Sequence, residues 1–227
     1  RHTRCFQATG RTAVSIVESK ATLAEEISRR YGVTAHGDLD AALAQRPTMA
    51  VIATPAPLHV SQAIKLVDAG VHVLIEKPLS ISIDGIDRLR AVAVERGTTV
   101  AVAYVLRSYP VLAAMRQALQ SGRFGTPRQL TMVCGQHFPT YRPAYREIYY
   151  ANRAAGGGAI QDALTHMVNL GEWLVGPVER LVADADHLVL PGVEVEDTVH
   201  LVARQGTVMA SYALNQHQAP NETILSV

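Results

Sequence analysis

The sequence predicts an α/β fold: a Rossmann-like parallel-sheet domain without its first strand, then an α/β domain with an open, mostly antiparallel sheet. In the first half, short β-branched runs alternate with helical stretches that end in glycine, which is typical of βαβ units. Those runs are continuously apolar, as expected for strands that helices cover on both faces. After Tyr109-Pro110 this alternation stops. We therefore expect two domains, over residues 1–106 and 107–227.

The first domain is predicted to contain four strands and three helices in alternation. Each helix is followed by a glycine, the residue best suited to the left-handed backbone that closes a helix. We expect strands over 14–17, 50–53, 71–75 and 99–105, and helices over 21–31, 58–69 and 83–96, which precede Gly32, Gly70 and Gly97.

The second domain is predicted to begin with one helix and one strand, followed by a loop rich in Tyr and Arg and a long helix. Its remainder is expected to be a strand meander that forms an antiparallel sheet. The expected helices cover 111–121 and 160–175, the loop 136–153, and the strands 129–134, 181–188, 197–203, 208–214 and 223–227.

The composition is typical of a globular protein and argues against nucleic-acid-binding, disulfide-rich and membrane-spanning classes. The chain has 227 residues, 48% hydrophobic and 18% charged, and a formal net charge of +1, so it can bury a sizeable core. It has no basic block and few aromatic residues, which argues against a nucleic-acid partner. Two distant cysteines, Cys5 and Cys134, suggest neither a disulfide framework nor a metal site. The longest apolar stretch, 100–106, is too short for a membrane span. We expect a reduced, cytoplasmic setting.

Both ends of the sequence look incomplete. The chain opens on Arg1-His2 without an apolar signal-peptide core, and it contains no GxGxxG turn to hold a pyrophosphate. Its last residues form a strand with no closing turn. We therefore interpret the sequence as an excerpt of a longer protein. This excerpt by itself is expected to bind a dinucleotide poorly, because it lacks the turn that would hold the pyrophosphate.

Glu76-Lys77-Pro78 follows directly after the predicted buried strand 71–75. A lysine there is costly to desolvate unless a ligand or partner uses its charge. Ligands of parallel α/β sheets bind at the carboxyl ends of the strands, so Lys77 is a candidate for binding a substrate hydroxyl, with Glu76 orienting it. A surface ion pair is the alternative.

Two further strand ends carry candidate cofactor residues. Glu18 ends the strand 14–17, where a carboxylate can accept hydrogen bonds from the ribose hydroxyls of NAD. Lys20 leaves NADP open, because a cation there could accept a 2′-phosphate. The segment from Ala53 through Thr54 and Pro55 to His59 follows strand 50–53, and its turn could place Thr54 near a dinucleotide. A solvated glutamate and a plain loop, with His59 a first-turn helix residue, are the alternatives.

Asp162 and His166 form a second candidate pair within the helix 160–175. Residues four apart lie on one face of a helix, and a carboxylate beside a histidine favours a general base near neutral pH. The preceding glycines 156–158 allow the backbone to approach a ligand closely. An ordinary pair on the helix surface is the alternative.

The loop 136–153 concentrates tyrosine hydroxyls and guanidinium groups just before that helix. Tyr141, Arg142, Tyr145 and Arg146, followed by Tyr149-Tyr150, suit a polyhydroxylated or acidic ligand. They equally suit a subunit interface, where Tyr and Arg are enriched.

These motifs, in this order and at these separations, resemble the Gfo/Idh/MocA oxidoreductases, the family of glucose-fructose oxidoreductase and inositol 2-dehydrogenase. The resemblance spans essentially the whole chain and implies an NAD(P)-binding domain followed by a substrate-binding and oligomerisation domain. The missing glycine-rich loop is a departure from the family pattern.

The resemblance also implies the roles of the site residues. Lys77, Asp162 and His166 would be the catalytic set: His166 exchanges a proton with the substrate hydroxyl, Asp162 orients and charge-balances it, and Lys77 binds the reacting oxygen. The cofactor, NAD or NADP, would lie against Glu18, Thr54, Pro55, His59, Glu76 and Lys77. The substrate would lie against Lys77, Tyr141, Arg142, Tyr145, Arg146, Asp162 and His166.

The expected activity is hydride transfer between nicotinamide and a hydroxyl or carbonyl carbon of a sugar, polyol or inositol-like substrate. No metal is implied, and the expected partners are that substrate and further copies of the chain, as a homodimer or homotetramer. Two alternatives remain open within the resemblance: an NAD-dependent glycosidase, and a non-enzymatic sensor that binds a dinucleotide.

Overall fold

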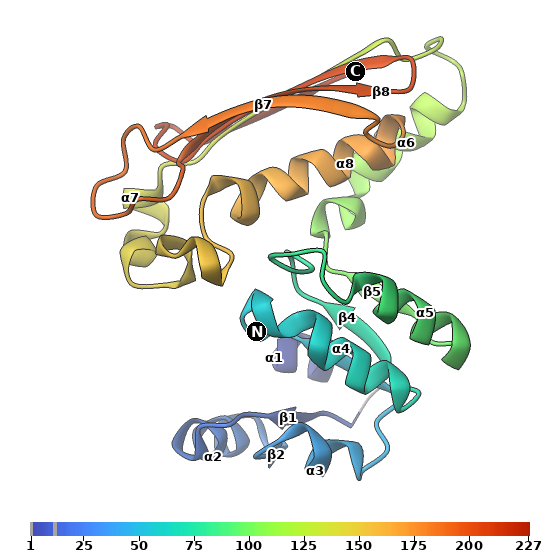
Figure 1. Cartoon of the computed structure of the whole chain (residues 1–227), viewed down its shortest axis with the longest axis vertical. Coiled ribbons are helices and arrows are strands. Elements are labelled where there is room, and N and C mark those ends of the chain that lie inside the picture. Colours follow the sequence, from blue (N-terminus) through green and yellow to red (C-terminus); the bar gives the residue numbers. More distant parts are fainter. Residues whose placement is uncertain (1, 11–12) are drawn as a thin grey trace. The chain divides into compact units, whose positions relative to one another are not determined.

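The protein is described here by a computed structural model of residues 2–10 and 13–227; Arg1 lies outside the described residues (Figure 1). The chain divides into two compact units. The first holds the described residues up to Ala53 together with Val60–Ile75 and Asp84–Ala101. The second holds Thr54–His59, Glu76–Ile83 and Val102–Val227. Two loops that interrupt the first half of the sequence therefore belong to the second unit.

The first unit is built from short parallel strands connected by helices. Its strands form two hydrogen-bonded sheets, of order β1-β2 and β3-β4-β5. Its elements are α1 (His2–Ala8), β1 (Ser15–Val17), α2 (Ala21–Tyr31), β2 (Thr34–His36), α3 (Leu39–Leu43), β3 (Met49–Ile52), α4 (His59–Asp68), β4 (His72–Ile75), α5 (Ile86–Arg96) and β5 (Val100–Val102). The parallel, Rossmann-like character predicted from the sequence is confirmed.

Helix α2 shows why the boundaries were predictable here. It ends at Gly32, whose φ of 63° is left-handed and whose N–H donates to Ser28 at 2.8 Å. That backbone suits glycine far better than other residues. Two elements between α2 and β3 were not predicted. Strand β2 has only three residues, and α3 has five, although the Asp38 side chain caps α3 by accepting the Ala41 N–H.

The second unit places helices on one face of a five-stranded sheet. The strands lie in the order β10-β6-β9-β8-β7. Its elements are α6 (Pro110–Gln120), β6 (Gln129–Gly135), α7 (Phe138–Tyr141), a π-helical turn (Ile160–Leu164), α8 (Thr165–Val175), β7 (Arg180–Asp186), β8 (Thr198–Gln205), β9 (Val208–Asn215) and β10 (Glu222–Ser226). Short 3-10 turns cover Ala56–Leu58, Val105–Ser108, Pro143–Arg146, Tyr149–Ala151 and Arg153–Ala155.

The sheet is mixed and mostly antiparallel. Strands β7, β8 and β9 form the expected meander, but β9 then pairs in parallel with β6. Strand β10 pairs antiparallel with β6, with Ile224 opposite Val133. The last strand therefore does not extend the meander, as the sequence pattern had suggested, but closes the opposite edge of the sheet.

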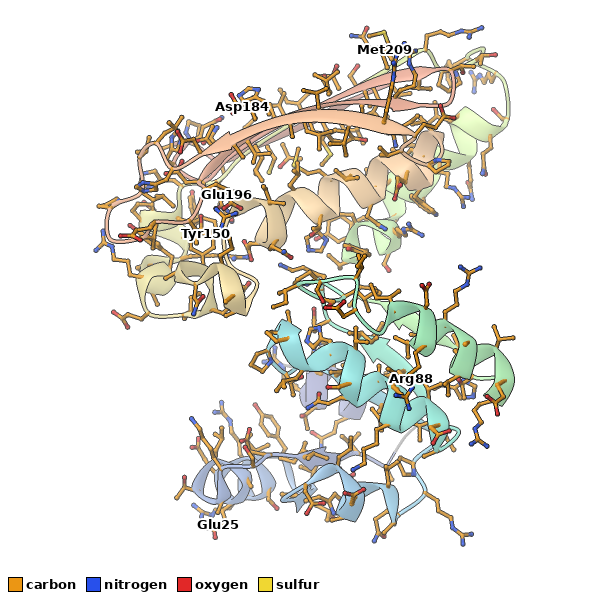
Figure 2. The ribbon with its side chains drawn as sticks, viewed as in Figure 1. Glu25, Arg88, Tyr150, Asp184, Glu196 and Met209 are labelled. Carbon is orange, nitrogen blue, oxygen red and sulfur yellow. The ribbon has the colours of Figure 1, made fainter. Side chains whose placement is uncertain are left out.

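Helix α8 runs along the buried face of this sheet (Figure 1). Its buried residues Met167, Leu170, Gly171 and Leu174 form one stripe and pack with the inward-facing residues of β6, β8 and β9. Gly171 permits this close packing, because a Cβ there would lie 1.8 Å from the Tyr212 hydroxyl oxygen. The opposite face carries exposed Val182 and Val202, which lie opposite each other on β7 and β8, and exposed Met209, which Figure 2 labels. Within the described residues, no helix has the length and apolar character needed to cross a bilayer.

Candidate active site

Lys77 is held by Asp162. The Lys77 Nζ donates to the backbone oxygen of Asp162 at 2.5 Å and to its Oδ1 at 3.2 Å, and the lysine side chain is 15% exposed. The carboxylate of Glu76, predicted to orient the ammonium, accepts the backbone N–H of Lys77 at 3.3 Å. A half-enclosed ammonium of this kind can donate to a ligand oxygen as well as to its carboxylate.

Asp162 is a buried carboxylate in the π-helical turn that precedes α8. Its side chain is 2% exposed and lies within hydrogen-bond distance of Lys77, Arg142, Tyr149 and Gln216. Burial alone would raise the pKa of Asp162. The charges of Lys77 and Arg142, with the hydrogen bond from Tyr149, outweigh burial and lower this pKa below its usual value. The carboxylate is therefore ionised at neutral pH.

His166 lies one turn further on, in the first turn of α8. Its ring meets the Tyr104 ring edge-on, with centroids 5.7 Å apart. Its Nδ1 is buried and has no hydrogen-bond partner among the described residues. Burial and the charge of Lys77 lower the pKa of His166 to about 4, against smaller opposing effects of Asp162 and Glu76. At neutral pH His166 is thus an uncharged imidazole that can accept a proton.

The glycines 156–158 are required by the protein's own packing. A Cβ on Gly157 would lie 2.2 Å from the Tyr150 carbonyl oxygen, and one on Gly158 would lie 2.4 Å from the Glu196 Oε1. Gly156 and Gly158 also have φ of 91°. The close approach predicted for a ligand is therefore made by Tyr150 and Glu196, which fix the start of the helix that carries Asp162.

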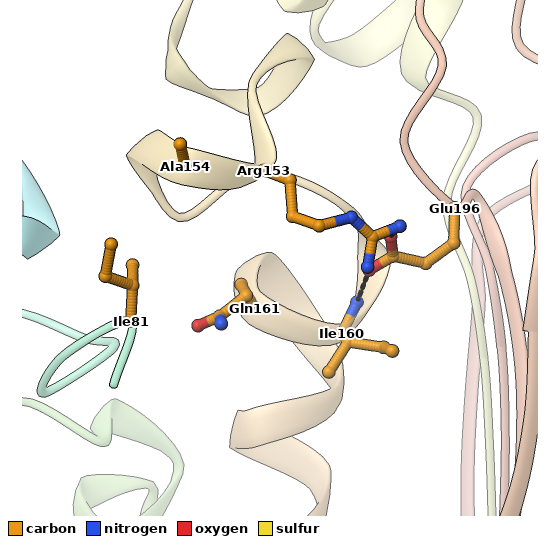
Figure 3. A pocket seen from close by; sticks show the side chains of 6 residues that line it. All are labelled: Ile81, Arg153, Ala154, Ile160, Gln161 and Glu196. Carbon is orange, nitrogen blue, oxygen red and sulfur yellow. Dashed lines mark hydrogen bonds and ion pairs between the residues drawn. The ribbon is translucent and has the colours of Figure 1, made fainter. Parts of the chain in front are cut away.

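A cavity of about 470 Å³ adjoins the same helix start (Figure 3). Buried Glu196 forms part of its wall, where it pairs with Arg153 at 2.7 Å and accepts the Ile160 N–H at 3.1 Å. The remaining lining residues are Ile81, Ala154 and Gln161. Gln161 directly precedes Asp162, so this cavity lies beside the candidate catalytic helix.

The Tyr and Arg loop divides into two roles. Arg142 reaches Asp162 with its Nη1 at 2.9 Å from Oδ2. Tyr145 is 1% exposed, and its hydroxyl donates to the Pro191 oxygen, as does the Arg146 Nε at 2.8 Å. Tyr145 and Arg146 therefore anchor the loop to Pro191. Tyr141 is exposed.

His59 connects two loops of the second unit. It is 1% exposed, with Nε2 2.7 Å from the Thr54 oxygen and Nδ1 2.9 Å from the Pro78 oxygen. Thr54 and Pro55 themselves are exposed. Both ring nitrogens of His59 thus face backbone oxygens. His59 thereby connects the loop of Thr54 to the loop of Pro78, which directly follows Lys77.

Glu18 belongs to the first unit and follows β1. Its Oε1 accepts the Lys20 N–H at 2.9 Å, and its own N–H donates to the His36 oxygen at 3.0 Å. A half-buried carboxylate at the end of a parallel strand fits the hydroxyl groups of a nucleotide ribose. In the second unit, an ammonium beside a neutral imidazole fits the reacting end of a nicotinamide cofactor and its alcohol.

Gln216 is a site residue that the sequence did not single out, and Tyr149 was named there only as one hydroxyl donor of the Tyr and Arg loop. Tyr149 stood in the predicted Tyr and Arg loop, where hydroxyl groups were a weak signal. Gln216 follows β9 in the sequence and reaches Asp162 only through tertiary structure. No local pattern marks it.

Comparison with protein-family models identifies both halves of the chain. Residues 1–104 match the oxidoreductase family with the NAD-binding Rossmann fold, GFO_IDH_MocA. Residues 112–226 match the GFO/IDH/MocA C-terminal domain.

Two curated relatives are dehydrogenases of sugars. The UDP-N-acetylglucosamine 3-dehydrogenase of Acidithiobacillus ferrooxidans is 28% identical over 71% of this chain and 46% of its own length. The levoglucosan dehydrogenase of Pseudarthrobacter phenanthrenivorans is 26% identical over 71% of this chain and 42% of its own length. The chain thus spans about half the length of these curated relatives.

A solved structure gives the same result for the fold. The WlbA dehydrogenase of Bordetella pertussis, solved with NADH and UDP-GlcNAcA, superposes with a TM-score of 0.84. It is 27% identical and covers 97% of this chain and 69% of its own. With two family models that together cover most of the sequence, the chain belongs to the Gfo/Idh/MocA family of oxidoreductases.

Proposed function

We propose that this protein is an NAD(P)-dependent dehydrogenase or reductase acting on a CH–OH group of a sugar, polyol or inositol-like substrate. The observation that carries the proposal is the presence of an ammonium, Lys77, whose charge acts on a neutral, half-buried imidazole, His166. Lys77 is fixed by Asp162, and His166 has a pKa of about 4. Alcohol oxidation needs both groups: a cation for the reacting oxygen and a base for its proton.

In the oxidative direction, Lys77 binds the substrate hydroxyl oxygen through an N–H of its ammonium. We assign His166 Nε2 as the atom that takes the hydroxyl proton, because Nδ1 is enclosed in the protein. The bound nicotinamide supplies the hydride acceptor. As the oxygen becomes a carbonyl, the Lys77 charge stabilises the negative charge that develops on it. In reduction, His166 returns the proton.

The substrate is proposed to lie against Lys77, His166 and the guanidinium of Arg142, with exposed Tyr141 at the margin. The cavity beside Gln161 offers further volume for a polyhydroxylated ligand. Relatives whose names specify sugar substrates support this class.

For the cofactor, Glu18 favours NAD, because its carboxylate can accept the 2′- and 3′-hydroxyl hydrogens of a ribose. Lys20 leaves NADP open. Thr54, Pro55, Glu76 and Lys77 are proposed to lie along the cofactor, whereas His59 acts by holding their loops.

We further propose a homodimer or homotetramer in the cytoplasm. The exposed face of the five-stranded sheet, with Val182, Val202 and Met209, is a suitable surface for association of two copies.

The test is a screen of polyols, aldoses, inositols and nucleotide sugars with NAD and NADP, using the protein that carries this sequence. Formation of reduced nicotinamide with at least one substrate is the expected result. Binding of NADH without turnover would favour the sensor, and release of a sugar without net NADH would favour the glycosidase. If a titration monitored by NADH fluorescence shows no binding, the oxidoreductase proposal is wrong.

A further inference from the structure

The carboxylate of Asp162 is surrounded by four donors from three separate segments: Lys77, the loop that carries Arg142 and Tyr149, and Gln216 after β9. Oδ1 accepts the Tyr149 hydroxyl at 2.6 Å and the Lys77 ammonium at 3.2 Å. Oδ2 accepts the Arg142 guanidinium at 2.9 Å and lies 3.4 Å from the Gln216 Nε2. Two of these donors, the Tyr149 hydroxyl and the Gln216 amide, are uncharged and so do not neutralise the charge of Asp162. Their common effect is to fix the rotation of the carboxylate.

Tyr149 acts only as a donor in this arrangement. Partial burial raises the pKa of its hydroxyl far above the usual value, and the nearby charge of Asp162 raises it further. The hydroxyl therefore stays protonated, and its hydrogen faces Oδ1. Proton exchange with a substrate is left to His166.

Gln216 is aimed at Asp162 by a buried tyrosine, Tyr150. The Tyr150 hydroxyl donates to Gln216 Oε1, and the two residues are 0% and 1% exposed. Because the amide oxygen is engaged, the Nε2 group must point to Oδ2. The backbone of Gln216 is also fixed, since its N–H donates to the Asp197 oxygen at 2.9 Å and its carbonyl accepts the Phe138 N–H.

These contacts leave Asp162 directed at Lys77. The backbone oxygen of Asp162 accepts the same ammonium, so Lys77 is bound at two points of one residue. His166 Nδ1 makes no hydrogen bond with Asp162 or with any other described residue. This differs from the predicted arrangement, in which Asp162 orients the histidine.

We propose that Tyr149 and Gln216 are positioning residues that lock the Asp162 carboxylate onto Lys77 and away from His166. The proposal rests on the proposed function insofar as Lys77 and His166 are taken as the reacting groups. Without the lock, the carboxylate can rotate toward His166, and the ammonium loses its fixed place beside the ring.

The test uses Tyr149→Phe and Gln216→Met, each of which removes one uncharged donor and keeps the side-chain volume. Tyr212→Phe and Gln205→Met are matched controls, because this buried tyrosine donates to this buried glutamine at 2.8 Å without contact to Asp162. The readouts are the NMR titration of the His166 ring and the separate values of kcat and KM.

We expect both site variants to raise the pKa of His166. The charge of Asp162 raises this pKa and the charge of Lys77 lowers it, so a carboxylate that rotates toward His166 and an ammonium that loses its fixed place both act in the same direction. We also expect kcat to fall about tenfold with a smaller change in KM, since one of several positioning contacts is lost. The controls should leave the titration and kcat unchanged. The titration needs no turnover, so it tests the positioning role even if hydride transfer fails.

The proposal is overturned if the measured pKa of His166 in Tyr149→Phe equals its value in the two control variants. Tyr149 is 42% exposed, so its conservative replacement keeps this outcome readable even if the buried Gln216 variant does not fold.

Discussion

The ammonium of Lys77 binds Asp162 twice, at its backbone oxygen and at its carboxylate. These residues lie 85 positions apart in the sequence. The contact lowers the pKa of Asp162 despite its burial, and the same ammonium helps to lower the pKa of His166. The Lys77 charge thereby favours the ionised carboxylate of Asp162 and, together with burial, the neutral imidazole of His166.

His166→Ala should reduce turnover by about 10²- to 10⁴-fold, the usual contribution of a general acid or base. The loss should appear in kcat, because cofactor and substrate contacts of the other residues remain. His200→Ala, which replaces an exposed histidine of β8, is the control and should keep the wild-type rate. A near-wild-type rate for His166→Ala on the true substrate would exclude it as the base.

His166 should also make stability depend on pH. Its pKa falls from 6.5 to about 4 on folding, so between these values the unfolded chain binds the additional proton. The stabilisation associated with neutral His166 is complete above about pH 6.5 and is lost as pH falls toward its folded-state pKa.

His166→Leu should therefore lose less stability than the wild type between about pH 7 and pH 5, as measured by urea unfolding. Parallel losses in the two proteins over this range would show that the folded-state pKa of His166 is not depressed.

Gly158→Ala should lower the unfolding free energy of the second unit by more than the cost of placing alanine at a positive φ. A non-glycine residue at positive φ costs about 1–3 kcal/mol, and the added Cβ also meets the buried Glu196 carboxylate at 2.4 Å. Gly122→Ala is the control, because Gly122 has φ of 69° but no atom within 4 Å of the added Cβ. Equal losses of unfolding free energy would contradict the packing role of Gly158.

His59→Ala should lower the unfolding free energy by about 1–3 kcal/mol, because the imidazole that lies between the backbone oxygens of Thr54 and Pro78, and donates to at least one of them, is lost. It should also lower turnover, since the loop that carries Lys77 is released. His72→Ala is the control: this exposed ring accepts the Thr99 N–H. If both variants behave alike in denaturant and in turnover, His59 does not hold these loops.

Much of the fold could be predicted from local pattern. Helix α2 covers the predicted range because apolar periodicity and a closing glycine both mark it. Strand β2 and helix α3 escaped prediction because they are too short to show a period. The position of β10 beside β6 also escaped, since register between distant strands is a tertiary property.

Lys77, Asp162 and His166 were predicted as one candidate site, and the structure brings Lys77 into contact with Asp162. The residues that support this contact were not predicted in that role. Lys77 after a buried strand and Asp162 four residues before His166 are local signals. Whether Asp162 faces His166 or Lys77 depends on the π-helical turn and on Gln216, which approaches from the end of β9. The glycines before Asp162 pointed to a close approach, but the approaching atoms belong to Tyr150 and Glu196.

The most direct measurement compares the rate of nicotinamide reduction by the wild type, Lys77→Met and Lys65→Met with a substrate from the screen. Lys65 is the matched control, because it forms an exposed ion pair with Asp40 at 2.6 Å. We expect Lys77→Met to be slower by about 10²- to 10³-fold, as when one donor to a developing oxyanion is removed. Lys65→Met should match the wild type. Equal rates for all three proteins would contradict hydride transfer at the Lys77, Asp162 and His166 site.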